Sequence, residues 1–113
     1  MSSRGAALRV SEAVPVFAAL GDATRLRLLG RLSADGPLSI TRLSEGTGVT
    51  RQAITRHLTA LGDAGLVRDS KQGRERVWEL DVKRLEVARR YLDEISTQWD
   101  DAAERLRAFV EDD

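Results

Sequence analysis

The sequence predicts a mostly α-helical fold that contains one small β-hairpin and ends in a long C-terminal helix. Three observations support this prediction. Apolar residues recur at helical spacing through residues 11–65. In residues 66–80 the period changes to two, and two strand-like runs flank a polar turn that contains glycine. Residues 81–110 then form a single helical pattern without glycine or proline.

Length and composition suit one compact domain, or a small domain with an appendage. The chain has 113 residues, 42% of them apolar, and its formal net charge is zero. The charge is unevenly distributed, because residues 1–80 hold 12 basic and 8 acidic side chains whereas residues 81–113 hold 6 and 10. Arginine supplies 16 of the 18 cations, so arginine rather than lysine at one position carries little information.

Several classes of protein are disfavoured by what the sequence lacks. There is no cysteine, which excludes disulfides, thiolate metal sites and cysteine nucleophiles. No apolar run approaches the ~20 residues that span a bilayer, and the first ten residues lack the apolar segment of a signal peptide. We therefore expect a soluble cytoplasmic protein without a membrane partner.

Two helices are predicted before residue 36. The first runs from the cap residue Ser11 to Leu20, with Pro15 in its first turn or so, and its helically spaced side chains are Val14, Phe17, Ala18 and Leu20. Gly21 ends it, and Asp22 caps a second helix over 23–34. The side chains that we expect to face inward there are Leu26, Leu28, Leu29 and Leu32.

A third, short helix and a fourth, longer helix follow the turn at 35–37. Ser39 caps the third helix, and Gly46 ends it. A tight link over 47–49 places the apolar Val49 between this helix and the one that begins after Thr50. Two helices joined by about four residues with glycine predict a helix-turn-helix. A generic α-hairpin inside a bundle is the alternative.

The helix over 50–65 has two faces of different chemistry. Its apolar stripe consists of Ala53, Ile54, Leu58, Leu61 and Ala64. The opposite face carries Arg51, Gln52, Thr55, Arg56 and Thr59, and no acid. Such a face suits the base edges and phosphates of DNA. A solvated surface that happens to lack acids is the alternative.

The strand-like runs at 66–70 and 75–80 predict a β-hairpin around the turn 71–74. Its tip and flanks carry Lys71, Arg74 and Arg76, with Glu75 as the nearby acid. A basic hairpin directly after a helix-turn-helix predicts a wing, which can place cations along the phosphates while the preceding helix enters the major groove. A solvated turn is the alternative.

The last helical pattern carries a heptad seam. The spacings alternate between three and four along Leu85, Ala88, Leu92, Ile95, Trp99, Ala102, Leu106 and Phe109. A helix of ~29 residues is about 43 Å long at ~1.5 Å per residue, which is too long for one small domain to bury. The seam therefore predicts pairing with a second copy, and a bundle with the first helix is the alternative. We divide the chain into a flexible N-terminus (1–10), a winged helix-turn-helix domain (11–80) and a C-terminal dimerisation helix (81–113).

Three motifs in this order resemble the ArsR family of winged-helix transcriptional regulators. FAALGDATRLRLLGRL resembles the family's second-helix signature, VTRQAITRHLTALGDAGLV its recognition helix, and QGRERVWEL its wing. The resemblance covers residues 12–80. It implies a homodimer, formed through the first and last helices, that binds double-stranded DNA as a repressor at an inverted repeat. Half-sites would lie about 34 Å apart.

The resemblance also implies site residues. Gln52 would bond adenine, and Arg51 or Arg56 would read guanine. His57 borders the apolar stripe, where a packed or capping role is favoured over a base contact. The full DNA-binding set is Ser39, Thr41, Thr50, Arg51, Gln52, Thr55, Arg56, His57, Lys71, Arg74 and Arg76. The dimer interface would comprise Val14, Phe17, Leu85, Leu92, Ile95, Trp99, Leu106 and Phe109.

The sequence departs from the metal-sensing members of that family. Residues 38–42 contain no thiolate, and the last helix contains no histidine. Its acids are best interpreted as a solvated coat, so we expect no metal and no cofactor. An effector, whether an organic ligand, a protein or a redox signal, stays unidentified.

Two functions remain open, and a third is disfavoured. The leading hypothesis is a DNA-binding repressor that acts by occluding a promoter, and its own promoter is one candidate. The alternative is a dimeric protein-interaction module with little DNA binding of its own. An enzyme is disfavoured, because the chain has one histidine, no glycine-rich phosphate loop and no convergent carboxylate pair.

Overall fold

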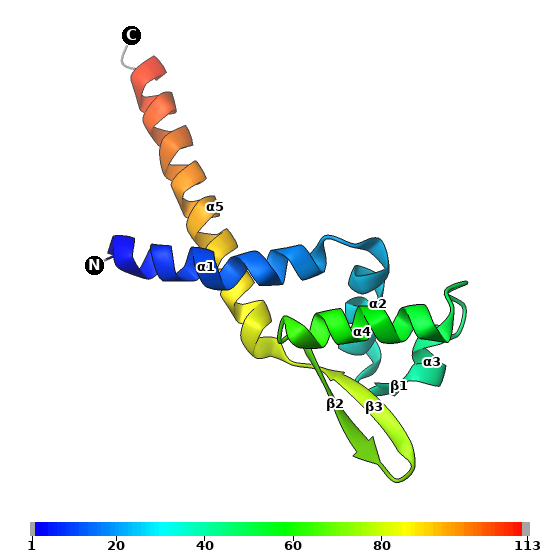
Figure 1. Cartoon of the computed structure of the whole chain (residues 1–113). Coiled ribbons are helices and arrows are strands. Elements are labelled where there is room, and N and C mark those ends of the chain that lie inside the picture. Colours follow the sequence, from blue (N-terminus) through cyan, green and yellow to red (C-terminus); the bar gives the residue numbers. More distant parts are fainter. Residues whose placement is uncertain (1, 112–113) are drawn as a thin grey trace.

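The computed structural model describes residues 2–111 and contains a helical domain, a small sheet and a projecting C-terminal helix (Figure 1). Its elements are α1 (Ser2–Leu20), α2 (Ala23–Asp35), β1 (Leu38–Ser39), α3 (Ile40–Ser44), α4 (Arg51–Asp63), β2 (Val67–Gln72), β3 (Glu75–Leu80) and α5 (Val82–Glu111). The predicted fold class, mostly α with a small β-hairpin and a long last helix, is confirmed.

The first helix is longer than the sequence indicated. It begins at Ser2, so its expected start at Ser11 is wrong. The preceding residues include alanine, leucine and arginine, which are strong helix formers, and serine tolerates a helix interior as well as a cap. Pro15 consequently lies in the middle of α1 rather than in its first turn. There it has no backbone N–H to donate to the helix. The helix also crosses the boundary that we expected at residue 10.

The second helix begins as predicted but buries fewer leucines. Oδ1 of Asp22 accepts a hydrogen bond from the backbone N–H of Arg25 at 3.1 Å, which makes Asp22 the N-cap. The inward stripe consists of Leu28, Leu29 and Leu32. Leu26 is 52% exposed, contrary to expectation. At 100° per residue it lies about 110° around the helix from the centre of that stripe.

The sheet has one strand more than expected. Its order is β1-β3-β2, antiparallel throughout, and β1 pairs Leu38 with Trp78 and Ser39 with Val77. A strand of two residues is too short to show a period of two, so the sequence pattern did not indicate it. The hairpin turn is also shorter than expected. Because β2 extends to Gln72, only Gly73 and Arg74 connect the strands, and Gly73 has a positive φ of 65°.

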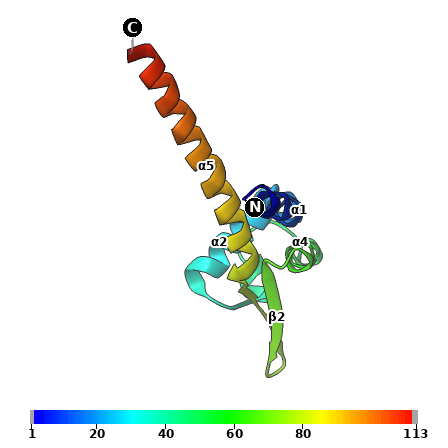
Figure 2. The same cartoon turned by 90° about the vertical axis from the view of Figure 1, so that its left-hand side faces the viewer.

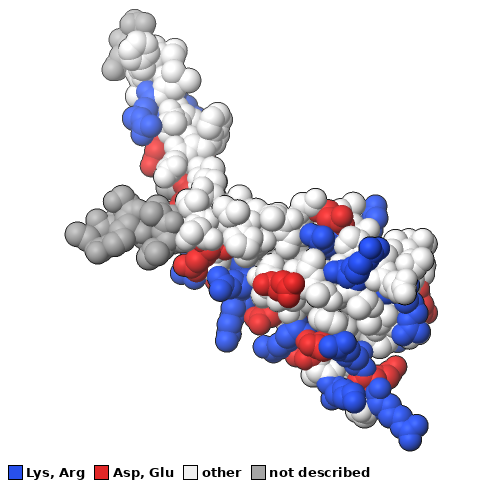
Figure 3. All heavy atoms as spheres, viewed as in Figure 1, with Lys and Arg blue, Asp and Glu red and all other residues white. Residues whose placement is uncertain are grey.

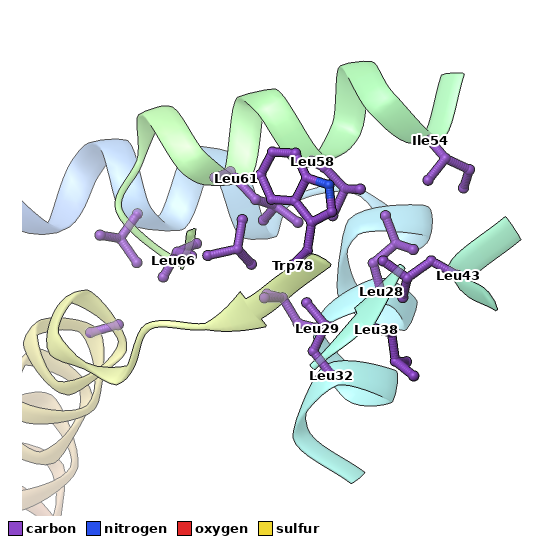
Figure 4. Close-up of a cluster of buried hydrophobic side chains, with 14 residues drawn as sticks. Leu28, Leu29, Leu32, Leu38, Leu43, Ile54, Leu58, Leu61, Leu66 and Trp78 are labelled. Carbon is purple, nitrogen blue, oxygen red and sulfur yellow. The ribbon is translucent and has the colours of Figure 1, made fainter. Parts of the chain in front are cut away.

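The core lies between α2, α4 and the sheet (Figure 4). Trp78 of β3 packs beneath α4 beside Leu58 and Leu61, and Ile54 and Leu43 lie further along the same cluster. The side chains with almost no exposure are Val16, Leu28, Leu43, Ile54, Leu58, Leu61 and Leu66. This packing joins the helix-turn-helix and the hairpin into one body.

The last helix is only partly covered by its own chain. Phe17 of α1 meets Tyr91 of α5 edge-on, with ring centroids 6.1 Å apart, and Ala88 is buried in the core. Beyond this point α5 projects from the domain, which gives the molecule extents of 68 × 31 × 20 Å (Figures 1 and 2). The alternative of an intramolecular bundle with α1 therefore describes the first part of α5 alone.

A matched pair of leucine substitutions tests this division between buried and exposed positions. Replacing Leu58 by Ala removes a fully buried side chain and should lower the free energy of unfolding by about 2–5 kcal/mol. Replacing Leu26 by Ala should change it by less than about 0.5 kcal/mol, because that side chain is half exposed. Urea denaturation of both variants measures the difference, and equal losses would contradict the placement of Leu26.

Candidate nucleic-acid interface

The turn that leads into α4 is fixed by short-range hydrogen bonds. Ser39 caps α3 by accepting from the backbone N–H of Arg42 at 3.3 Å. The hydroxyl of Thr47 donates to the carbonyl of Ser44 at 2.9 Å and accepts from the N–H of Val49 at 3.1 Å. Val49 packs against the core, as the sequence predicted. These contacts set where α4 begins.

A side chain from α2 supports the same turn from behind. The guanidinium of Arg31 donates to the carbonyl of Leu43 at 3.0 Å and to that of Glu45 at 3.5 Å. Both carbonyls lie at the C-terminal end of α3, where a helix leaves its last acceptors without intrahelical partners. Arg31 satisfies them and so connects α2 to the helix-turn-helix.

Helix α4 presents the polar face that the sequence predicted. Thr50 is its N-cap and accepts from the N–H of Ala53 at 3.1 Å. Ile54, Leu58 and Leu61 have no exposed surface, so the rotation of the helix about its axis is fixed. A shallow hollow lies on the opposite face, lined by Thr50, Arg51, Gln52, Thr55 and Arg56.

The polar groups on this face differ in what they can still bind. The hydroxyl of Thr55 already donates to the carbonyl of Arg51 at 2.9 Å, so it can only accept from a ligand. Gln52 is exposed, and among residues 2–111 its amide has no hydrogen-bond partner, so both its donor and its acceptor are available. Arg51 and Arg56 are exposed, and among residues 2–111 neither has an ion-pair partner. The first turn of α4 therefore carries uncompensated positive charge, to which the helix dipole adds.

His57 is half-buried and contacts α2. Its Nδ1 accepts a hydrogen bond from Nε of Arg25 at 3.2 Å and lies 3.9 Å from Oδ1 of Asp22. The backbone N–H of Arg25 holds the pKa of the Asp22 carboxyl below its ordinary value. His57 thus belongs to the contact between α4 and the start of α2, as in the packing role that we favoured for it.

The residues that open α3 lie at the edge of this surface. Thr41 is exposed, and Ser39 is half-buried with its Oγ engaged in the cap. The Ser39 hydroxyl proton is still available to a phosphate oxygen. Ser39 also belongs to β1, which brings the start of α3 next to the strand that forms the wing.

The basic residues of the wing fall into two groups. Lys71 and Arg74, near the tip, are exposed and have no ion pair within the described part of the chain. Arg76 instead pairs with Asp69 and stacks on Trp78, its guanidinium carbon lying 5.5 Å from the ring centroid. The nearby acid that we expected, Glu75, is therefore not its partner.

A second arginine of the hairpin is also neutralised. Nε of Arg68 lies 3.0 Å from Oε1 of Glu79, and its guanidinium is 3.9 Å from Asp81. The Glu79 carboxylate raises the pKa of Arg68. The register pairs Arg68 directly with Glu79, and neither this pairing nor that of Asp69 could be recognised before the register was known. Positive charge on the wing is thus concentrated at its tip.

The charge distribution on the face seen in Figure 3 agrees with this assignment. In Figure 3, lysine and arginine side chains gather along the wing and around the end of the domain where α4 begins, with some acids among them. The projecting part of α5 is mostly uncharged in the same view.

The predicted dimer residues divide into exposed and partly covered ones. Phe17 and Leu85 pack against the core of their own chain. The exposed apolar members are Val14, Leu92, Ile95, Trp99, Leu106 and Phe109, and Trp99 and Phe109 keep 72% and 73% of their surface. Val14 is on α1, and the other five lie on α5, where they form an apolar face that nothing in the described chain covers.

Two other features, a metal centre and a membrane-spanning helix, are absent from residues 2–111. No cluster of three or more histidine or acidic side chains that could hold a metal ion is found there. No helix in this range combines the length and the apolar character needed to cross a bilayer.

The helix-turn-helix followed by a two-stranded wing defines a winged helix-turn-helix protein. A family model described as a helix-turn-helix domain matches residues 20–69. The HTH-type transcriptional regulator Rv2034 of Mycobacterium tuberculosis is 40% identical over 80 residues, which cover 71% of this chain and 74% of the relative. The arsenical resistance operon repressor of Escherichia coli is 31% identical over 97 residues, 86% of this chain and 80% of the relative.

Solved structures give the same result. An ArsR-like transcriptional regulator from Rhodococcus sp. RHA1 superposes with a TM-score of 0.74 at 35% identity, covering 88% of this chain and 93% of that one. The homodimeric winged helix-turn-helix DNA-binding domain of Mb0332 from Mycobacterium bovis has a TM-score of 0.63 at 27% identity, with 93% of each chain covered. The chain belongs to the ArsR family of winged helix-turn-helix transcriptional regulators.

Proposed function

We propose that the chain is a dimeric repressor that binds an inverted-repeat operator in double-stranded DNA. The observation that carries this proposal is the exposed face of α4 over residues 51–59, which carries no acid and whose orientation is fixed by Ile54, Leu58 and Leu61. The exposed acid of this helix, Asp63, lies on the same side one turn further on, at the C-terminal end. A helix held in this way can enter the major groove with Arg51, Gln52 and Arg56 toward base edges. In this orientation the N-terminal end of α4 would be the end inserted into the groove.

In this proposal the wing and the start of α3 bind the backbone on either side of the groove. Lys71 and Arg74 are free to bind phosphates, because no acid of the described chain pairs with them. Thr41 and Ser39 would add hydroxyl contacts from α3. His57 contributes by holding α4 against α2 and is not proposed to contact bases.

Dimerisation through α1 and α5 would pair two such surfaces. The exposed face of α5 supports it, as does the homodimeric Mb0332 domain, whose match covers 93% of this chain. A two-fold dimer would place two α4 helices about 34 Å, one turn of DNA, apart and so read an inverted repeat. Residues 11–80 would then form the DNA-binding domain and residues 81–113 the dimerisation part.

Repression is proposed by analogy with the arsenical resistance operon repressor that the chain resembles. A dimer bound over a promoter would exclude polymerase, and an operator upstream of its own coding region would make the control autoregulatory. Because its proposed ligand is chromosomal DNA, we expect the protein to act in the cytoplasm. No catalytic step and no cofactor is part of this proposal.

Selection of duplexes from a random library by the purified full-length chain tests this function. We expect enrichment of an inverted repeat, and binding to it should weaken steeply with salt because each phosphate contact releases counterions. A stable dimer that shows no preference over random DNA would instead identify the protein-interaction module considered above.

Removal of one guanidinium should separate base reading from phosphate binding. Replacing Arg51 or Arg56 by Ala should cost about 1–3 kcal/mol on the selected duplex and much less on random DNA if that side chain reads a base. Arg90→Ala, on an exposed position of α5, is the matched control and should bind as the wild type does. Fluorescence anisotropy with both duplexes measures these losses, and an equal loss on both would reassign the residue to phosphate.

A charge on the seam should separate the two subunits. Trp99→Glu places a carboxylate in the proposed interface, and because Trp99 is 72% exposed in one chain the subunit should still fold. Dimerisation, followed by sedimentation, should be lost, and operator binding with it. Thr97→Glu adds the same charge on the opposite side of α5 and should leave the dimer intact. A Trp99→Glu dimer as stable as the wild type would remove this interface.

A further inference from the structure

One face of the wing combines an acid, two cations and an aromatic ring. The register places Asp69 opposite Trp78 and Lys71 opposite Arg76, so these four side chains lie on the same side of the hairpin. Val67 continues this face into the core beneath α4. Two cations directly opposite one another repel, and Asp69, diagonal to Arg76, is the acid that reduces this repulsion.

Arg76 is held by two contacts in the free protein. Its Nε donates to Oδ2 of Asp69, and its guanidinium lies over the ring of Trp78. Trp78 is 5% exposed and cannot move without disturbing the core, so the stacked position of Arg76 is a defined one. The side chains of Arg76 and Asp69 remain 60% and 36% exposed, which leaves the pair open to a competing anion.

We propose that Asp69 is a built-in competitor for the phosphate that Arg76 binds, and that it sets the affinity of the wing for DNA. The inference rests on the proposed function, because it requires a duplex against this face. On binding, the phosphate takes the place of the Asp69 carboxylate on Arg76, and the stacking on Trp78 is kept. Asp69 is left without its cation, close to a phosphate.

The strength of the pair is suited to such an exchange. An ion pair this exposed contributes little to stability, so a phosphate in the strong field of a duplex can displace it. Binding nevertheless loses the contribution of the pair on every duplex, whatever its sequence. Asp69 therefore lowers binding to random DNA, where backbone contacts supply nearly all the affinity.

The other wing cations do not share this arrangement. Lys71 and Arg74 have no acid to release, and Arg68 is paired on the opposite side of the hairpin with Glu79. The inference is thus specific to the pair of Asp69 and Arg76.

A double-mutant cycle on the full-length chain tests the exchange. The probe is a short labelled duplex of random sequence at low salt, since the contact does not depend on base sequence. Asp69→Asn should tighten binding roughly twofold to fivefold. Glu75→Gln is the control, because it removes an equal charge one residue from Arg76. Glu75 has no ion pair among the described residues, so its replacement should give a smaller gain in affinity.

The second arm of the cycle uses Arg76→Gln. In the Arg76→Gln background, Asp69→Asn should raise the affinity for the duplex no more than Glu75→Gln does. The reason is that no Arg76 guanidinium is present for the loss of Asp69 to release. In the wild-type background, Arg76→Gln should weaken DNA binding less than Lys71→Gln does. In the Asp69→Asn background, the two substitutions should weaken DNA binding equally. The slope of log affinity against log salt should then fall by about one from Asp69→Asn to the double variant.

The outcomes separate this inference from the proposed function. If no variant binds any duplex, the proposed function fails, and the exchange fails with it. If the wild type binds DNA but Asp69→Asn gains equally with and without Arg76, or no more than Glu75→Gln, the exchange is overturned while the regulator remains. Far-UV circular dichroism checks that each variant folds. If Asp69→Asn does not fold, the comparison of Arg76→Gln with Lys71→Gln in the wild-type background still tests the exchange, and equal losses of affinity there would overturn it.

Discussion

The packing of α4 against the core is the constraint on which the proposed interface depends. Ile54, Leu58 and Leu61 have no exposed surface, so the helix cannot rotate without opening a cavity beneath it. Trp78 fills the space between these side chains and the sheet (Figure 4). The exposure of the polar face over residues 51–59 is therefore a consequence of what the opposite face buries. Arg31 holds the preceding turn in place through its hydrogen bond to the carbonyl of Leu43.

The caps of α2, α3 and α4 were predicted correctly from local sequence, whereas the cap expected at Ser11 was not, because α1 begins at Ser2. The caps Asp22, Ser39 and Thr50 each accept the hydrogen bond that their residue type and position indicated, because capping involves only the next three residues. The long pattern of α5 was predictable for a similar reason, since a heptad repeated over several turns has few other interpretations.

Features that depend on distant partners were not predictable from the sequence. The two residues of β1 become a strand only because Leu38 and Ser39 meet β3. Whether Arg76 is free or neutralised depends on strand register, which a shift of one residue would reverse. The set of polar residues on α4 followed from its period, whereas the neutralisation of Arg68 and Arg76 required the folded hairpin.

The pairing of β1 with β3 has a mechanical consequence for the domain. Ser39 caps α3 and is also hydrogen-bonded, as part of β1, to the strand that continues into the wing. The hairpin is thus connected directly to the helix-turn-helix through Ser39. A displacement of the hairpin tip would therefore be transmitted to the start of α3. In the proposed complex with DNA, the wing and the recognition helix would therefore bind and dissociate together rather than one after the other.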